Sequence, residues 1–366
     1  MTTVSNKQKW FNTIRFTHDD DLYVGIDTHK ESFHVALWLN DAPAIDFVAP
    51  PDNIKLVDTL NKLRIALRLV VYEAGPTGYS LARMLQQADI PVSVVAPSKT
   101  PRQSAPDSKT DSLDARKLAE YAAKGLLRRI AIPTKHQEAQ RQLTRLRQQL
   151  VEKQRRIKLQ IKSFLLQHGI NQPAGLSHWS RAAVEHLKNI SLPTPLRYCL
   201  DTLLEELRFI ADQIKLTEQK IKEAFSEKPI CTTVKLLTTH PGVGQTIATQ
   251  FAAEIFNPKR FSDKTQLAKY VGLAPSVHQS GQTFRDGPIL KTGRPQLRCS
   301  LIQGAWIWIQ KDHNAYKTFC RLIRNTGHKN KAITAMARKL AVHLWIMARD
   351  NKPYDAAARH DSPQAA

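Results

Sequence analysis

Short apolar segments separated by turn-forming residues occupy most of the first hundred residues. From Leu22 the chain reads LYVGID, then ESFHVALWL, then AIDFVA, and these runs of β-branched and aromatic residues predict three strands in a β-meander. Beyond a predicted helix from Ile54 to Leu67 come the apolar strand LRLVVYEA, a helix after GPTG, the strand PVSVVA and a helix that begins near Thr110. This alternation predicts an α/β domain with a mixed, partly parallel sheet.

Apolar residues three and four positions apart replace this pattern between about Glu138 and Phe225 and predict long helices. One helix carries a face formed by Leu143, Leu146, Leu150, Ile157, Ile161 and Phe164. The next carries an unbroken seam, typical of a coiled coil, of Leu196, Leu200, Leu203, Leu207, Ile210, Ile214, Thr217 and Ile221. The Gly- and Pro-containing segment HGINQPAGLSHW separates the two helices. The pattern predicts an antiparallel helical pair, which could also join two copies of the chain.

Glycine and basic residues concentrate after Ile230, in LLTTHPGVGQTIATQFAAEI and YVGLAPSVHQSGQTFRDGPILKTGRPQLR, before a helical, basic C-terminal segment. HPGVGQT in front of a helix looks like a helix-hairpin-helix element. In such an element the turn at Gly242 and Gly244 would let backbone N–H groups approach a DNA phosphate. An ordinary tight turn between helices is the alternative. The segment is not a P-loop, because the Gly-Lys-Ser/Thr ending is absent.

These changes of pattern divide the chain into five predicted parts. They are an N-terminal extension (1–20), an α/β domain (21–132), a helical coiled-coil domain (133–228), a mainly helical C-terminal domain (229–350) and a flexible tail (351–366). The sequence assigns no role to residues 1–20 or 168–195.

The charge balance points to the partners of the protein. The chain has 54 Lys and Arg against 32 Asp and Glu, a net charge of +22, and such a positive field attracts nucleic acid. No apolar run reaches the roughly 18 residues of a membrane-spanning helix, and the first residues lack a signal-peptide core, so we expect a cytoplasmic protein with no membrane partner. The four scattered cysteines predict neither a zinc site nor a disulfide framework.

Basic residues gather in two regions. The segment from Arg141 to Leu165 has eight basic residues against one acid, which indicates either phosphate contact or a solvated helix face. The candidate phosphate contacts in this segment are Arg145, Arg155, Arg156 and Lys158. Four more candidates follow in the glycine-rich region, namely Arg285, Lys291, Arg294 and Arg298.

Four acidic residues stand where the predicted fold would bring them together. Asp27 ends the first strand and Glu73 the fourth, and the carboxyl ends of neighbouring parallel strands meet at one edge of a sheet. Asp111 and Asp114, three residues apart, would share one face of a helix at the same edge. Clustered carboxylates repel one another unless a cation neutralises them, and carboxylate oxygens suit Mg²⁺ or Mn²⁺. The pattern therefore predicts a divalent-metal site for phosphoryl transfer, of the two-metal type.

A structural interpretation of the same acids stays open. Asp111 and Asp114 would lie in the first turn of a helix, where acids interact favourably with the helix dipole, and Thr110 or Ser108 could cap that helix. Three lysines could be ion-pair partners for the acids, namely Lys30, Lys109 and Lys117.

Several motifs, taken in order, carry a family likeness. GIDTHK, EAGPTGY and KTDSLDA are followed by PGVG, YVGLAPSVHQSG, KTGRPQLR and ARKLAVHLW. Over roughly Leu22 to Ala348 this series resembles the transposases of the insertion sequence 110 family, which are known as DEDD transposases. The resemblance implies a RuvC-like domain of RNase H fold, a coiled-coil segment and a C-terminal transposase domain.

The same resemblance implies how the protein works. It implies that Asp27, Glu73, Asp111 and Asp114 bind the divalent metal, and that Ser280, in HQSG, is the nucleophile that attacks DNA. It also implies that a structured bridge RNA encoded by the element guides recombination between donor and target DNA. Two strand exchanges on two duplexes need several active sites, so we expect a dimer or a tetramer. The recognised DNA sequences would be set by base pairing with the RNA.

Two other functions stay open from the residues themselves. A structure-selective endonuclease of the Holliday-junction resolvase type would use the metal site alone, with water as nucleophile. A non-catalytic nucleic-acid-binding protein would use the carboxylates only to stabilise its fold. Ser280 on its own would be interpreted as a turn-forming residue beside Gly281 in a polar loop.

Overall fold

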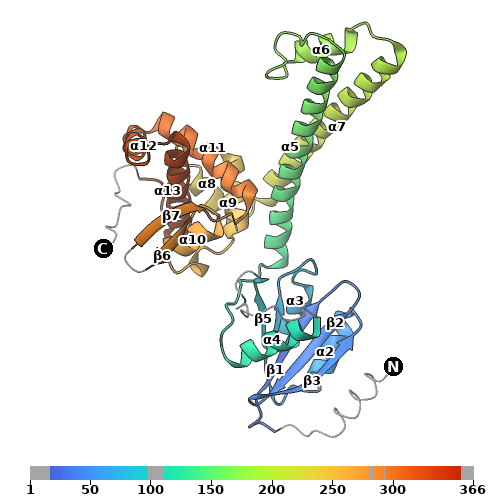
Figure 1. Ribbon diagram of the computed structural model, residues 1–366, viewed down its shortest axis with the longest axis vertical. Coiled ribbons are helices and arrows are strands. Elements are labelled where there is room, and N and C mark those ends of the chain that lie inside the picture. Colours follow the sequence, from blue (N-terminus) through green and yellow to red (C-terminus); the bar gives the residue numbers. More distant parts are fainter. Residues whose placement is uncertain (1–16, 98–99, 101–110, 281–282, 292, 356–366) are drawn as a thin grey trace. The chain divides into compact units, whose positions relative to one another are not determined.

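The computed structural model describes residues 17–97, 100, 111–280, 283–291 and 293–355, with only the backbone of residues 277–280 and 283–286. The chain forms two compact units, residues 1–132 and 133–366, and each is treated by itself (Figure 1). The five-part division made from the sequence stays a prediction.

The first unit is built on a mixed five-stranded sheet with the strand order β3-β2-β1-β4-β5. The strands are β1 (Leu22–Thr28), β2 (Phe33–Leu39), β3 (Ala42–Ala49), β4 (Leu67–Glu73) and β5 (Val92–Val95). The first three form the predicted antiparallel meander, and β4 and β5 run parallel to β1. This confirms the mixed sheet of an RNase H-like α/β domain.

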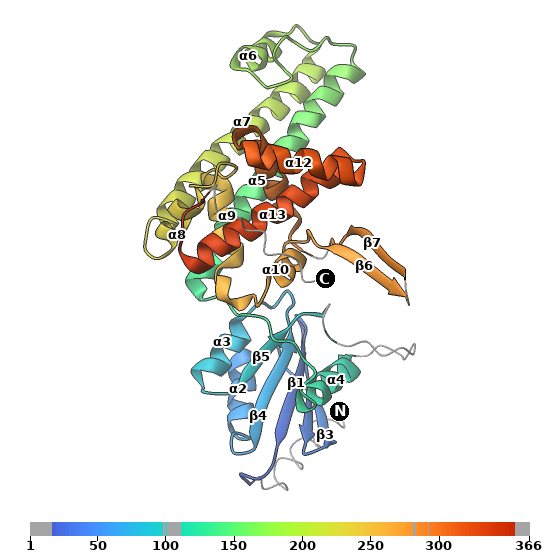
Figure 2. The same cartoon turned by 90° about the vertical axis from the view of Figure 1, so that its left-hand side faces the viewer.

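Helices cover both faces of this sheet (Figure 2). They are α2 (Asn53–Asn61), α3 (Ser80–Gln87) and α4 (Asp111–Ala123). The larger core joins β1, β2 and β4 to α2 and α3, with Leu60, Leu85 and Tyr72 fully buried in it. On the other face, Leu118 and Ala122 of α4 pack against Val71 and Val95. The unit therefore has three layers, with α4 alone on its face among the described helices.

The helix predicted from Ile54 to Leu67 is shorter than expected. It ends at Asn61, because the chain must turn before Leu67 enters the sheet beside Leu22. The turn residue Ala66 accepts a hydrogen bond from the Leu22 amide, and Ile65, which the periodicity assigned to a helix, is 45% exposed.

The second unit begins with two long helices, α5 (Lys135–Gln167) and α7 (Thr194–Ala224), which lie side by side in opposite directions (Figure 1). The short helix α6 (Arg181–Asn189) packs near the C-terminal end of α5 and the N-terminal end of α7. The buried residues of α7 largely follow the predicted seam, but Leu204 is buried and Leu203 only partly. On α5 the prediction was wrong for Leu146, which is 39% exposed, whereas Thr144 is buried.

The remaining helices of this unit form a separate core. They are α8 (Ile230–Leu237), α9 (Gln245–Ile255), α10 (Lys264–Tyr270), α11 (Pro295–Lys311), α12 (His313–Thr326) and α13 (Lys329–Asp350), with the short 3₁₀ helix η2 (Pro258–Arg260). The long helix α13 lies in the middle, and its Leu340, Ala341 and Leu344 are fully buried. A two-stranded hairpin, β6 (Pro275–Ser280) and β7 (Thr283–Ile289), projects from it (Figure 2). The mainly helical C-terminal part is confirmed.

Candidate metal centre and nucleic-acid contacts

Asp27 and Glu73 lie at the carboxyl ends of neighbouring parallel strands. Asp27 is the penultimate residue of β1 and Glu73 the last residue of β4. Because side chains alternate across a strand, Asp27 shares a face with Gly25, and Glu73 shares it with Val71. Val71 packs against Leu118 of α4, so both carboxylates are on the face that α4 covers.

Gly25 allows α4 to approach this face closely. A Cβ atom added to Gly25 would lie 2.5 Å from the backbone nitrogen of Ala119 and would collide with the carbonyl oxygen of Ala115. The backbone of α4 therefore rests directly on β1. This approach determines how close Asp111 and Asp114, in the first turn of α4, come to the end of β1.

A polar contact also fixes the start of α4. Asp46 of β3 accepts hydrogen bonds from Ser112 Oγ, at 3.2 Å, and from the guanidinium of Arg116. One carboxylate thus holds two consecutive turns of the helix to the sheet.

Substituting Gly25 with Ala lowers the free energy of unfolding of the first unit by about 3 kcal/mol, because the methyl group meets backbone atoms that cannot move aside. The check is chemical denaturation of the purified protein. Gly75→Ala is the matched control, since an added Cβ there would meet only the Glu73 carbonyl oxygen at 3.9 Å. Equal stability of the two variants would contradict the close approach of α4.

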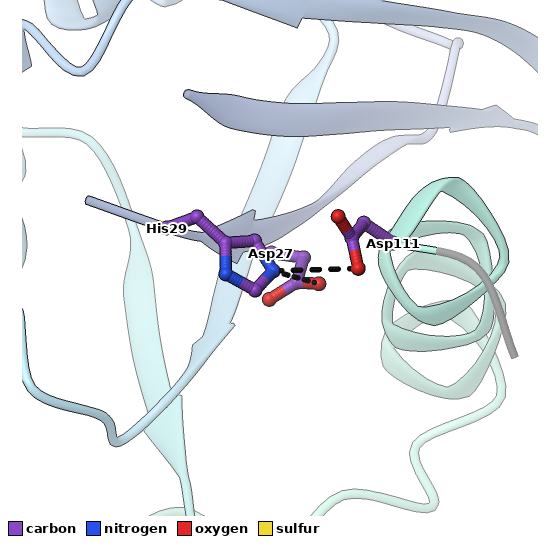
Figure 3. Close-up of side chains that lie close together, drawn as sticks. All are labelled: Asp27, His29 and Asp111. Atoms are coloured by element: carbon purple, nitrogen blue, oxygen red, sulfur yellow. Dashed lines mark hydrogen bonds and ion pairs between the residues drawn. The ribbon is translucent and has the colours of Figure 1, made fainter. Parts of the chain in front are cut away.

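Three side chains from β1, the turn that follows it and α4 converge at this edge (Figure 3). His29 Nε2 lies 3.0 Å from Asp27 Oδ2 and 3.5 Å from Asp111 Oδ1. From β2, His34 Nε2 lies 3.6 Å from the other oxygen of Asp111. The imidazole of His29 thus lies between the carboxylates of Asp27 and Asp111 and faces both of them.

The donor atoms of this group suit a divalent cation. One ligand atom from each of Asp27, His29 and Asp111 lies within 4.8 Å of the others. Half of the Asp111 side chain is exposed, so solvent reaches the group. Two carboxylate oxygens with one imidazole nitrogen are a donor set for Mn²⁺ and similar ions, whereas Mg²⁺ prefers oxygen alone.

Glu73 and Asp114 lie outside this group of ligand atoms. Glu73 Oε1 accepts a hydrogen bond of 2.8 Å from Thr100 Oγ1, which holds the carboxylate at the end of β4. Asp114 is half-buried on α4, one turn before the buried Leu118. The structure therefore brings two of the four predicted acids into one group and leaves the other two nearby in the fold but outside it. The expected caps Thr110 and Ser108, and Lys109, lie outside the described residues.

His29 is the residue that the sequence interpretation missed. One signal could have found His29, and a second points to its neighbour His34. Asp27 and His29 are two positions apart at the end of a strand, so their side chains share a face, and His34 is the direct cross-strand partner of Asp27. A search for carboxylates alone passes over both histidines.

Ser280 is the last residue of β6 and pairs with Thr283 of β7. The expectation of a polar loop was therefore wrong, because PSVHQS and TFRDGPI pair as an antiparallel hairpin. The side chains of Ser280 and Arg285 are not among those described.

The base of this hairpin is narrow. Gly272 has a φ of +71°, and a Cβ atom added to it would lie 3.1 Å from the amide nitrogen of Gly293. A Cβ atom on Gly293 would collide with the backbone of Gly272 and Tyr270. The two ends of the hairpin segment therefore touch, backbone to backbone, where only glycine fits.

The predicted phosphate contacts on α5 have different surroundings. Arg145 is engaged by Glu254 of α9, with its Nε and Nη2 at 2.8 and 3.0 Å from the two carboxylate oxygens. Arg155 and Arg156 are exposed and pair with Glu152 of their own helix. Lys158 Nζ lies 5.5 Å from the ring centre of Trp179, and partial burial lowers the pKa of Lys158.

The two glycines of the HPGVGQT turn also differ. The Gly242 amide donates to Nδ1 of His240 at 3.2 Å, and a Cβ atom on Gly242 would lie 2.5 Å from the carbonyl oxygen of Gly304 in α11. Gly242 therefore serves helix packing, and its amide is already used. Gly244 is exposed at the N-cap of α9 with open space around it.

The remaining predicted contacts surround the start of α11. Lys291 and Arg294 are exposed, and Arg294 is the N-cap residue of that helix. Arg298 is half-buried, one turn further on, and a Cβ atom on Gly272 would lie 2.6 Å from its Nη1. Among the described helices, none combines the length and the apolar character that crossing a membrane requires.

Known proteins are similar in sequence to this chain along most of its length. Residues 24–170 match the DEDD transposases of insertion sequence IS110, and residues 234–321 match the family described as "Transposase IS116/IS110/IS902 family". The chain is 31% identical to the transposase candidate y4rJ of Sinorhizobium fredii over 76% of each protein.

Two further relatives extend over nearly the whole length. The transposase for insertion sequence element IS1328 of Yersinia enterocolitica is 24% identical over 88% of this chain and 96% of its own. The transposase for IS1111A of Coxiella burnetii is 24% identical over 95% of each chain. With its mixed sheet, its acids at the sheet edge and its helical C-terminal part, this chain belongs to the IS110 family of transposases.

Proposed function

We propose that this transposase cuts and rejoins DNA strands with a divalent-metal site at the edge of its five-stranded sheet and with Ser280 as nucleophile, under the direction of a structured RNA. The observation that supports the metal site most strongly is the convergence of Asp27, His29 and Asp111 at the carboxyl end of β1. Membership of the family supports the DNA substrate.

In this proposal Asp27, Glu73, Asp111 and Asp114 hold Mg²⁺ or Mn²⁺, and His29 adds a nitrogen donor. When bound, the ion offsets negative charge that develops on the phosphate during transfer. Other residues of the chain position the side chains that would hold the ion. Thr100 orients Glu73, and the contact of Gly25 with α4 holds Asp111 beside Asp27.

Ser280 carries the covalent step. Its hydroxyl gives up a proton, the Oγ–P bond forms, and the bond from phosphorus to the sugar oxygen of the leaving strand breaks, after which that oxygen takes up a proton. In the second step a sugar hydroxyl of the new partner strand attacks the same phosphorus, and the Ser280 hydroxyl is restored. One P–O bond forms as another breaks in each step, so no external energy source is needed.

The basic surface of α5 is proposed to contact nucleic-acid phosphates. Substituting Arg155, Arg156 and Lys158 together with Gln should make RNA binding less sensitive to salt. The slope of the logarithm of the binding constant against the logarithm of the salt concentration is negative, and we expect its magnitude to fall by about 2, because each lost phosphate contact removes roughly 0.7. Substituting Arg208, Lys215 and Lys220 of α7 with Gln removes the same charge and should leave the slope unchanged. Equal slopes for the two triple variants would place the RNA elsewhere.

The test of the function starts from the nucleic acid that purifies with the protein. We expect a discrete, structured RNA. The complex should recombine donor and target DNA that match this RNA when Mg²⁺ or Mn²⁺ is present, and should not do so after chelation. Light scattering on the active complex should give the mass of a dimer or a tetramer. Recombination that persists without a divalent ion would overturn the metal site.

A further inference from the structure

Three arginines of the second unit surround one buried carboxylate. The side chain of Glu254, near the end of α9, is only 4% exposed. Arg145 of α5 binds both of its oxygens, at 2.8 and 3.0 Å, and Arg141, one turn earlier, places Nε at 3.7 Å. Arg294, which precedes α11, places Nε at 3.9 Å. Segments 149 residues apart in the chain, at Arg145 and Arg294, therefore meet at a single acid.

A fourth arginine joins from the 3₁₀ helix η2. Arg260 donates from Nη2 to the main-chain oxygen of Glu254 at 3.2 Å. Its guanidinium lies against three aromatic rings, those of Phe256, Phe261 and Tyr270, with its central carbon 4.3–4.5 Å from their centres. We refer to Arg141, Arg145, Arg260 and Arg294 with Glu254 as the Glu254 cluster.

The Glu254 cluster carries more positive charge than its acid can neutralise. Three guanidiniums stand within ion-pair distance of one carboxylate, so the cluster holds three positive charges around one negative charge before Arg260 is counted. Like charges held this close repel one another, and an anion placed among them removes the repulsion.

Two nitrogen atoms in the cluster also need acceptors. Nη2 of Arg141, whose side chain is 8% exposed, and Nε of Arg260 are buried and have no hydrogen-bond partner in the described part of the chain. A buried guanidinium N–H without an acceptor is costly, and an anionic oxygen satisfies it. Among the described residues, the cluster therefore combines an excess of positive charge with donors that lack an acceptor.

The cluster can be reached from solvent, and it adjoins the hairpin that carries Ser280. The Arg294 side chain is 53% exposed and that of Arg145 is 30% exposed. Tyr270, which precedes the hairpin, donates its hydroxyl to the main-chain oxygen of Glu254 at 3.1 Å, and Arg294 follows the hairpin. Glu254 thus anchors the chain on both sides of β6 and β7.

We propose that the Glu254 cluster binds a backbone phosphate of nucleic acid. The planar fork of the exposed Arg294 matches the oxygens of a phosphodiester, and Glu254 keeps the guanidiniums in place when no strand is bound. This inference rests on the proposed function, because the phosphate belongs to a DNA or RNA strand that the transposase handles. It adds one built site, at the junction of α5, α9 and α11, to the phosphate contacts proposed for the surface of α5.

The test is equilibrium binding of a labelled 30-base-pair DNA duplex and, separately, of a labelled RNA of equal length, to the full chain over a range of salt concentrations. Arg294→Gln should reduce the magnitude of the slope of the logarithm of the binding constant against the logarithm of the salt concentration by about 1. We expect this reduction for the nucleic acid, DNA or RNA, whose phosphate the site binds. Arg208→Gln on α7 removes the same charge from an exposed helix face and should change neither slope. Arg294→Lys should keep the slope but weaken binding, because the fork is lost.

Arg294 is chosen because its exposed side chain can be replaced without opening the core, and thermal unfolding of each variant checks this. A slope of smaller magnitude for DNA or for RNA supports the site and shows which of the two nucleic acids supplies the phosphate. Unchanged slopes for Arg294→Gln in both arms, with steep salt dependence in the parent protein, overturn this site alone. If the parent protein binds neither probe, the proposed function itself fails.

Discussion

Substituting Asp111 with Asn abolishes recombination while the first unit keeps its fold. A bound cation needs the negative charge of the carboxylate, whereas a helix cap needs only an oxygen acceptor, which Asn retains. Loss of an anionic ligand of a catalytic metal costs several kcal/mol of transition-state stabilisation, so we expect a fall of about a thousandfold. Asp27→Asn should behave in the same way, because His29 connects the two carboxylates.

The measurement combines recombination assays with Mn²⁺ binding followed by electron paramagnetic resonance, which reports on the site without any turnover. Asp58→Asn, an exposed acid on α2, is the matched control and should keep both activity and Mn²⁺ affinity. His29→Ala should weaken Mn²⁺ binding more than Mg²⁺ binding, because only the former ion favours an imidazole ligand. Full activity of Asp111→Asn would instead favour the capping interpretation.

Ser280→Ala should bind RNA and DNA as the parent protein does, yet yield no covalent adduct and no recombinant product, a loss of about 10⁴-fold or more. Water at a metal site can break a strand, but the energy of the broken bond is then lost. A phosphoserine link retains that energy and holds the strand end in place for the second attack.

The adduct is sought directly. Protein, RNA and matching DNA are incubated with Mg²⁺ and digested, and mass spectrometry then searches for a nucleotide on the peptide that contains Ser280. Ser276→Ala is the control, since its hydroxyl donates to the Pro288 carbonyl within the same hairpin. Continued recombination by Ser280→Ala would assign the reaction to water, as in a resolvase-type endonuclease.

Local pattern predicted the sheet and the positions of the four acids near one edge of it. The alternation of apolar strands and helices fixed which strands pair with β1, and the ends of β1 and β4 placed Asp27 and Glu73 at one edge. The i, i+3 spacing placed Asp111 and Asp114 on one face of α4. These features depend on neighbours in sequence or on the rule that parallel strands end together, so they can be predicted without coordinates.

Long-range partners could not be predicted in this way. Arg145 belongs to a basic run that indicates phosphate contact, but its carboxylate partner, Glu254, is 109 residues away in an apolar helix. Gly242 stands in a turn that suggests phosphate binding, but Gly304 of α11 takes up the space beside it. No periodicity within one segment encodes either contact, because both arise only when separate helices pack.

The contact between Gly272 and Gly293 makes the Ser280 hairpin an exchangeable module. Since the chain enters and leaves the segment at one point, strands β6 and β7 can be replaced by the corresponding strands of a relative, provided that Leu273, which is buried in the helical core, is kept. Chimeric transposases that exchange only these two strands should therefore fold, and the length of the hairpin can be engineered separately from the helical core that supports it.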